Sequence, residues 1–87
     1  MPYIKVEDRL VFEEAIQSFK KASERSLTPG DLNYFLTSIC HHYLLRKGVS
    51  YTHLNDVVGV LESAKLEFYR RIISSYEDDK IKQNGDV

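Results

Sequence analysis

Apolar residues recur at helical spacing along most of the chain, and two short breaks divide this pattern into three segments. The breaks are Thr28-Pro29-Gly30 and Lys47-Gly48-Val49-Ser50. Apolar residues three and four positions apart form one stripe on an α-helix, so each segment predicts an amphipathic helix. We therefore predict an all-α fold with helices at about 7–25, 29–47 and 53–80.

The first two helices are marked by their ends as well as by their stripes. In the first, acidic residues come early and basic residues late, which complements the helix dipole. The second opens with Thr28 as N-cap, Pro29 at the first helical position and Asp31 near the free N–H groups, and Gly48 follows its last turn. The stripes are Val11, Phe12, Ala15, Ile16, Phe19 and Ala22 in the first helix, and Leu32, Phe35, Leu36, Ile39, Cys40, Tyr43 and Leu44 in the second.

The third helix is long for a chain of this size. Ser50 or Thr52 caps its start, and no proline precedes Asn84-Gly85. A helix over 53–80 spans about 40 Å, whereas a compact domain of this length is about 30 Å across. Either the helix breaks near Ser74-Ser75, or its C-terminal half projects and packs against another chain.

The apolar residues of the third helix favour a second subunit. One stripe holds Leu54, Val57, Val58, Leu61, Ala64 and Phe68, and a strip displaced by about a quarter turn holds Leu66, Tyr69, Ile73 and Tyr76. A helix that is apolar on two adjoining faces has two neighbours, so the second strip predicts a homodimer through the second half of this helix. The alternative is that the N-terminal arm, Met1-Pro2-Tyr3-Ile4, covers one wide stripe within a single chain.

We predict that residues 1–87 form a single domain, a three-helix bundle. The first two helices form an antiparallel pair in this bundle, and the long third helix packs across both. A chain of 87 residues buries only about 60–65% of its unfolded surface, so its core is thin and burial against a second copy adds stability.

Composition and charge exclude several classes of protein. The single cysteine, Cys40, cannot form a disulfide within the chain, and 12 Lys and Arg against 13 Asp and Glu give a net charge of −1. This charge creates no field that would gather nucleic acid or anionic lipid. The chain has no run of about 18 apolar residues and no secretory signal pattern, so we expect a cytoplasmic protein without a membrane partner.

Lys65 lies within the main apolar stripe of the third helix and has two interpretations. In the first, its stem covers apolar surface while its ammonium reaches water or Glu62, one turn earlier. In the second, a desolvated Lys65 pairs with a carboxylate of another helix, with Asp31 and Glu14 as candidates.

The run Tyr69-Arg70-Arg71 combines an aromatic ring with two guanidinium groups, which can grip phosphate or stack on a base. However, Glu67 stands three and four residues before the arginines, at the spacings that allow ion pairs on a helix. An ion-paired, solvated face is therefore the simpler interpretation, and the balanced charge argues against a nucleic-acid partner.

Few residues of the sequence indicate a metal site or a nucleotide site. Cys40, His41 and His42 are adjacent, so their side chains point about 100° apart and cannot all reach one ion. We expect no metal site and no cofactor.

The all-helical MazG-like pyrophosphatases hold Mg²⁺ with E-x-x-E and a later E-x-x-D, and small size, helicity and oligomerisation make this chain similar to them. Here the second acid of each motif is a base, because Lys65 follows Glu62 and Lys80 follows Glu77. The remaining way to bind Mg²⁺ is an intermolecular arrangement of Glu62, Glu67 and Asp78.

Several segments carry a resemblance to another family. They are MPYI at 1–4, GDLNY at 30–34, LNDVVG at 54–59, ESAKLEFYRR at 62–71 and YEDDKIKQNGDV at 76–87. Together they resemble a family of small uncharacterised proteins encoded by bacteriophages and prokaryotes and found in environmental sequences. The resemblance implies no particular activity.

These observations favour a non-enzymatic accessory protein of phage or prokaryotic origin that acts through protein–protein contacts. The alternative is a MazG-like nucleotide-binding or nucleotide-processing protein that lacks the usual acidic motifs. We predict no catalytic, cofactor-binding or metal-binding residues. The candidate polar or interface site comprises Glu62, Lys65, Tyr69, Arg70 and Tyr76.

Overall fold

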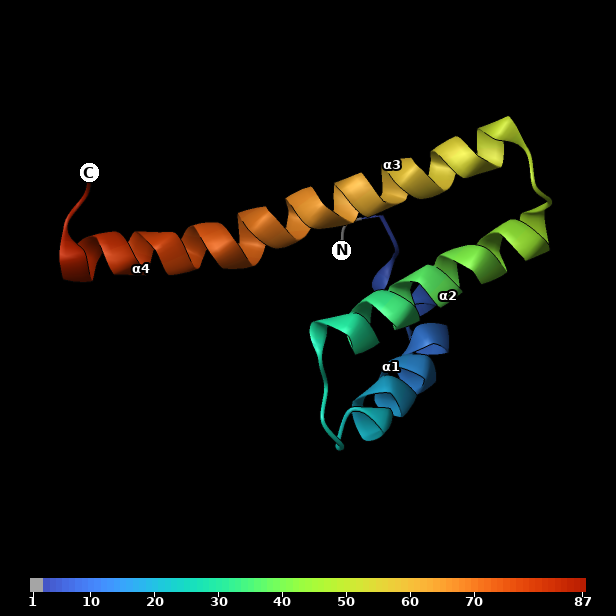
Figure 1. The fold of residues 1–87 in the computed structure, drawn as a ribbon, viewed down its shortest axis with the longest axis horizontal. Helices are drawn as coiled ribbons and strands as arrows, with labels where there is room; N and C mark the ends of the chain where they lie inside the picture. The colour runs from blue at the N-terminus through green and yellow to red at the C-terminus, as the bar shows by residue number, and fades with distance from the viewer. Residues whose placement is uncertain (1–2) are drawn as a thin grey trace. The chain divides into compact units, whose positions relative to one another are not determined.

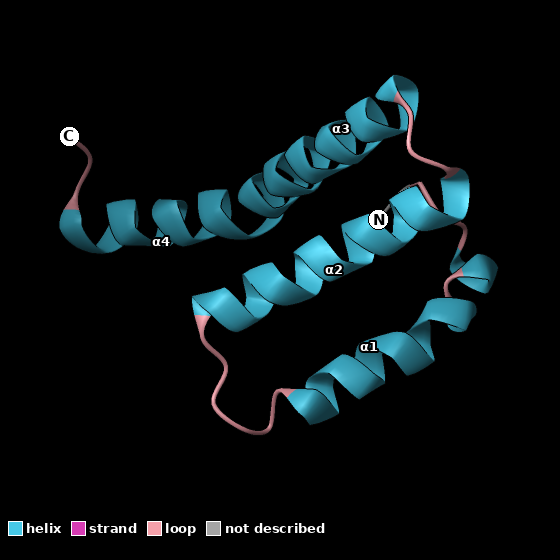
Figure 2. Ribbon diagram, turned by 45° about the vertical axis from the view of Figure 1, so that its right-hand side comes forward, coloured by secondary structure: helices cyan, strands magenta, loops and turns pink. Residues whose placement is uncertain are grey.

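The computed structural model describes residues 3–87, and these form helices joined by short loops (Figures 1 and 2). The elements in chain order are a 3₁₀ turn η1 (Val6–Asp8), α1 (Leu10–Ala22), α2 (Pro29–Lys47), α3 (Tyr51–Phe68), a π-helical segment η2 (Tyr69–Ile73) and α4 (Ser74–Asn84). The last three follow one another without a loop and make one helical stretch of 34 residues, about 51 Å long. We call this stretch the long helix.

The all-α class, the three helices and the great length of the third are confirmed. The second helix has the predicted bounds. The first is shorter at both ends, because residues 6–8 form the separate turn η1 and α1 ends at Ala22. The third is longer than predicted, since it runs from Tyr51 to Asn84. Contacts between residues distant in sequence are few in the described part of the chain, so the antiparallel pair and the bundle stay predictions. Met1 and Pro2 of the predicted arm lie outside the described residues.

The contacts of the chain fall into two units, one ending at Thr37 and the other comprising Ser38–Val87. The boundary lies within α2. The first unit therefore holds α1 and the beginning of α2, and the second holds the end of α2 and the long helix. A single domain over residues 1–87 stays a prediction.

A reciprocal pair of hydrogen bonds fixes the start of α2. The Asp31 N–H donates to Thr28 Oγ1 (3.1 Å), and the Thr28 N–H donates to Asp31 Oδ2 (2.9 Å). Both bonds satisfy N–H groups that the helix itself leaves free. The predicted N-cap is therefore confirmed.

The N–H and the hydroxyl of Thr28, followed by the charge of Arg25, lower the pKa of Asp31 below its usual value. Because this pKa is lower in the folded chain than in the unfolded one, the carboxylate stabilises the helix start fully above the unfolded pKa. That stabilisation is lost as the pH falls through the folded pKa.

Glycine and serine set the boundary between α2 and α3. Gly48 has φ 93°, and its N–H donates to the Leu44 carbonyl (2.7 Å), which ends α2. Ser50 then caps α3, because Ser50 Oγ accepts from the His53 N–H (3.1 Å). Of the two predicted caps, Ser50 is the one used.

The first unit contains a stack of two phenylalanine rings. The ring centroids of Phe19 in α1 and Phe35 in α2 are 4.5 Å apart, with the planes tilted by 35°. Such pairs contribute beyond the area they bury. No residue of the described chain is fully buried, and Phe19 is half-buried, so this contact is a principal apolar link of the unit.

Replacing Thr28 with alanine removes one of the two capping bonds. We expect the free energy of unfolding to fall by about 1 kcal/mol. Urea unfolding followed by circular dichroism measures the change. Thr37→Ala, on the exposed part of the same helix, is the control and should stay within about 0.5 kcal/mol of the parent. Equal losses for the two variants would contradict a capping role.

Replacing Phe19 with alanine should lower the free energy of unfolding by about 1–2 kcal/mol. This is less than the roughly 3–5 kcal/mol for a fully buried phenylalanine, because Phe19 keeps part of its surface in water. Phe12→Ala in the same helix is the control, since Phe12 is 53% exposed. A Phe12 variant that loses as much stability as the Phe19 variant would argue against the ring stack.

Candidate interaction site

The predicted site residues all lie on the long helix, where each pairs with a neighbour. Lys65 Nζ lies 3.2 Å from Glu62 Oε1, with side chains 68% and 56% exposed. This is the first of the two interpretations of Lys65, in which its ammonium reaches Glu62. Exposed pairs of this kind contribute little to stability, so both charges remain available to a partner.

Glu67 holds both arginines of the predicted cluster. Its carboxylate accepts from Arg71 Nε and, at 3.4 Å, from Arg70 Nη2. The two guanidinium groups cover the Glu67 side chain, which is only 16% exposed. The hydrogen bond from Arg71 is the main reason why the pKa of Glu67 is lower than usual. The ion-paired face predicted from the sequence is thus present.

The two tyrosines contact residues of α4. The Tyr69 hydroxyl donates to Glu77 Oε1 (3.3 Å), and Lys80 Nζ lies 5.5 Å from the centre of the Tyr76 ring. The second distance is typical of a cation–π contact. Glu77 was not among the predicted site residues, because a spacing of eight residues does not indicate contact on a regular α-helix.

The π-helical segment explains the contact between Tyr69 and Glu77. The Ser74 N–H donates to the Tyr69 carbonyl, five residues earlier, instead of to a carbonyl four residues earlier. A π turn holds about one residue more than an α turn, so the residues beyond it are rotated back by about 100°. A regular helix would place Tyr69 and Glu77 about 80° apart, and the π turn reduces this to about 20°.

The same rotation changes the predicted strips. Tyr76 turns toward the stripe of Leu61 and Phe68, and away from Leu66, with which the regular spacing had grouped it. The helix does not break at Ser74-Ser75, since η2 continues directly into α4. The irregularity instead lies just before Ser74 and turns the helix about its axis.

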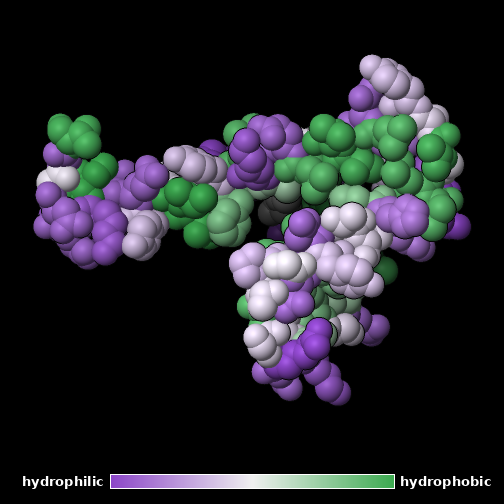
Figure 3. Space-filling model, in the orientation of Figure 1, coloured by the Kyte–Doolittle hydropathy of each residue, from purple (hydrophilic) through white to green (hydrophobic). Residues whose placement is uncertain are grey.

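Large apolar side chains along this face are open to solvent. Phe68, Ile72 and Tyr76 are 58%, 54% and 62% exposed, and Leu61 and Tyr69 are also exposed. In Figure 3, green apolar surface extends over α3 and recurs farther along the long helix. We call Leu61, Phe68, Tyr69, Ile72 and Tyr76 the long-helix face.

The described residues contain no group of three histidine, cysteine or acidic side chains that could hold a metal ion. Cys40 is free and half-buried. His53 Nδ1 lies 2.7 Å from the Gly48 carbonyl, a contact that belongs to the turn before α3.

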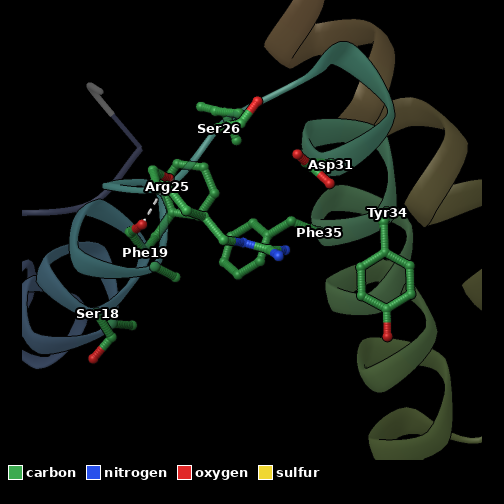
Figure 4. Close-up of a pocket in the computed structure, with 11 residues that line it drawn as sticks. Ser18, Phe19, Arg25, Ser26, Asp31, Tyr34 and Phe35 are labelled. Atoms are coloured by element: carbon green, nitrogen blue, oxygen red, sulfur yellow. Dashed lines mark hydrogen bonds between the residues drawn. The ribbon is translucent and has the colours of Figure 1, made fainter.

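The first unit also contains a cleft of about 510 Å³ between α1 and the first turns of α2. Figure 4 shows the rings of Phe19 and Phe35 in it, with the Arg25 guanidinium reaching toward Phe35. The residues predicted from the sequence as a candidate site do not include this cleft. The available signal was Ala15 and Ala22, whose small side chains on the stripe of α1 leave space beside the rings.

The full length of the chain, residues 1–87, matches the family described as Domain of unknown function (DUF6899). The chain belongs to this family. Its membership confirms the resemblance to uncharacterised proteins and assigns no activity. No curated protein and no solved structure matches the chain. Among the helices of the described residues, none is both long enough and apolar enough to cross a bilayer.

The ion pairs of Glu67 lead to a prediction about its titration. Arg71→Gln should raise the pKa of Glu67 toward the usual glutamate value of about 4.3, and Arg70→Gln should raise it less, because Arg71 makes the dominant hydrogen bond. Carboxyl NMR titration measures both.

The lowered pKa means that Glu67 stabilises the fold fully above its unfolded pKa, and that this contribution is lost as the pH falls through the folded pKa. An equal rise of the Glu67 pKa in the Arg70→Gln and Arg71→Gln variants would contradict the dominance of Arg71.

Proposed function

We propose that this member of the family is a non-enzymatic accessory protein of a phage or prokaryote, which acts through protein–protein contacts of the long helix. The observation that carries this proposal is the π turn beside the long-helix face. π turns are rare and occur frequently at functional sites. Here the turn brings exposed aromatic residues before and after it toward one side of the helix.

A second copy of the chain is the proposed first partner, with the long-helix face as the contact. Helices that present a row of apolar residues bind partners by laying that row against another apolar surface. A small chain in which none of residues 3–87 is fully buried also has the most to gain from burial between copies.

The alternatives have weaker support. A MazG-like nucleotide site needs several carboxylates that face a metal ion, whereas the Glu67 carboxylate is held by Arg70 and Arg71 of its own helix. Nucleic-acid binding needs free guanidinium groups, and Arg70 and Arg71 are both held by Glu67. No observation favours either function over protein binding.

Light scattering across about 1 μM to about 100 μM, which corresponds to roughly 8 to 5.5 kcal/mol of binding free energy, tests the proposed dimer. We expect the molar mass to rise from one chain to two. Phe68→Ser and Tyr76→Ser should each weaken the dimer about tenfold or more, because each removes an aromatic contact.

Leu66→Ser is the matched control. Leu66 is 57% exposed but lies about 160° around the helix from Phe68, so its variant should dimerise like the parent. A parent chain that stays monomeric over the whole range would remove the basis of the proposed dimer.

A further inference from the structure

The charges of the long helix repeat in one order on the two sides of the π turn. Glu62 and Lys65 precede it, and Glu77 and Lys80 follow it, each acid three residues before its base. Lys65 and Glu77 each lie six residues from Arg71, in opposite directions. Glu62 and Lys80 each lie nine residues from it, and Arg71 is the middle residue of η2.

We infer that two copies pair through their long helices in antiparallel orientation, with the two-fold axis near Arg71 and with Lys65 of each copy beside Glu77 of the other. This inference rests on the proposed function and specifies its partner and geometry. A two-fold interface repeats every contact, so one pair of complementary positions gives two ion pairs.

The charge order distinguishes this orientation from the parallel one. In an antiparallel pair centred on Arg71, Lys65 faces Glu77 and Glu62 faces Lys80. In a parallel pair in register, every one of these residues faces its own copy, and like charges repel. The same sequence therefore favours one orientation and opposes the other.

The π turn places the complementary charges on one side. A regular helix would separate Lys65 and Glu77 by about 120°, and the π turn reduces the separation to about 20°. The hydrogen bond from Tyr69 to Glu77 is direct evidence that Glu77 lies on this side. The Lys65 side chain is 68% exposed, so it can reach a partner.

Apolar contacts fit the same arrangement. Tyr69 and Ile73 each lie two residues from Arg71, so each faces the other across the axis. Tyr69 and Ile72 are exposed beside the axis, and Ile73 is half-buried. The centre of the proposed interface is therefore apolar and its ends are charged, the usual organisation of a protein interface.

Charge reversal tests the inference. Lys65→Glu and Glu77→Lys should each weaken the homodimer about tenfold, because each replaces two attractive pairs by two repulsive ones. The double variant K65E/E77K should recover the parent affinity. An equimolar mixture of the two single variants should form a heterodimer more strongly than either variant forms a homodimer, and sedimentation of a fluorescently labelled variant measures this.

Lys82→Glu and Asp78→Lys are matched controls, since they reverse charges of the same helix on its opposite side. They should dimerise like the parent, and circular dichroism verifies the helix content of every variant. A monomeric parent would overturn both this inference and the proposed homodimer. A parent dimer whose affinity is unchanged by both reversals would overturn the antiparallel pairing alone.

A distance measurement gives a second readout. In a Cys40→Ala background, a spin label at Gln83→Cys should lie about 36 Å along the axis from its copy, because each label is 12 residues from Arg71. In a parallel pair the two labels would lie about 10 Å apart, near the distance between packed helices. The short distance would overturn the inference.

Discussion

The π-helical segment η2 determines which side chains of the long helix share a face. The Ser74 N–H reaches the Tyr69 carbonyl, and the additional residue in that turn rotates everything that follows. The contact of Tyr69 with Glu77, the position of Tyr76 relative to Phe68 and the common side of Lys65 and Glu77 all depend on this rotation. The polar pairs and the apolar face are therefore two consequences of the same local backbone change.

The remaining interactions are local. Reciprocal hydrogen bonds between Thr28 and Asp31 cap the start of α2, and Ser50 caps the start of α3. Glu67 forms ion pairs with two arginines of its own helix. Each acts over a few residues, and the ring stack of Phe19 and Phe35 links two helices. Helices of this kind gain most of their stability from packing of an apolar face, not from propensity. The exposed apolar surface is consistent with a chain that completes its packing with a partner.

The sequence was most informative where local chemistry decides the structure. Thr28, Ser50 and Gly48 marked helix ends, and the spacing of Glu67 from the arginines indicated their ion pairs. The first helix was predicted too long at both ends. Residues before Leu10 continue its polar pattern but form a 3₁₀ turn, and no glycine or proline marks the end of α1 at Ala22. A constant rotation of 100° per residue placed Leu66, Tyr69, Ile73 and Tyr76 in one strip. Such a rotation cannot reveal a π turn. Glu77 and the cleft beside Phe19 depend on three-dimensional placement and left little trace in the spacing.

The π turn also changes how this family member can vary in length. Within a regular helix, adding or removing one residue rotates all later side chains and scrambles the face that they form. Here the helix already contains one residue more than a regular helix needs. Loss of one residue between Tyr69 and Ile73 would restore regular α-helical bonding and leave α4 at about the same angle relative to α3, because the π turn already turns the later residues back by about 100°. The segment is thus the place where a single-codon deletion would preserve both the helix and the surface that its C-terminal part presents.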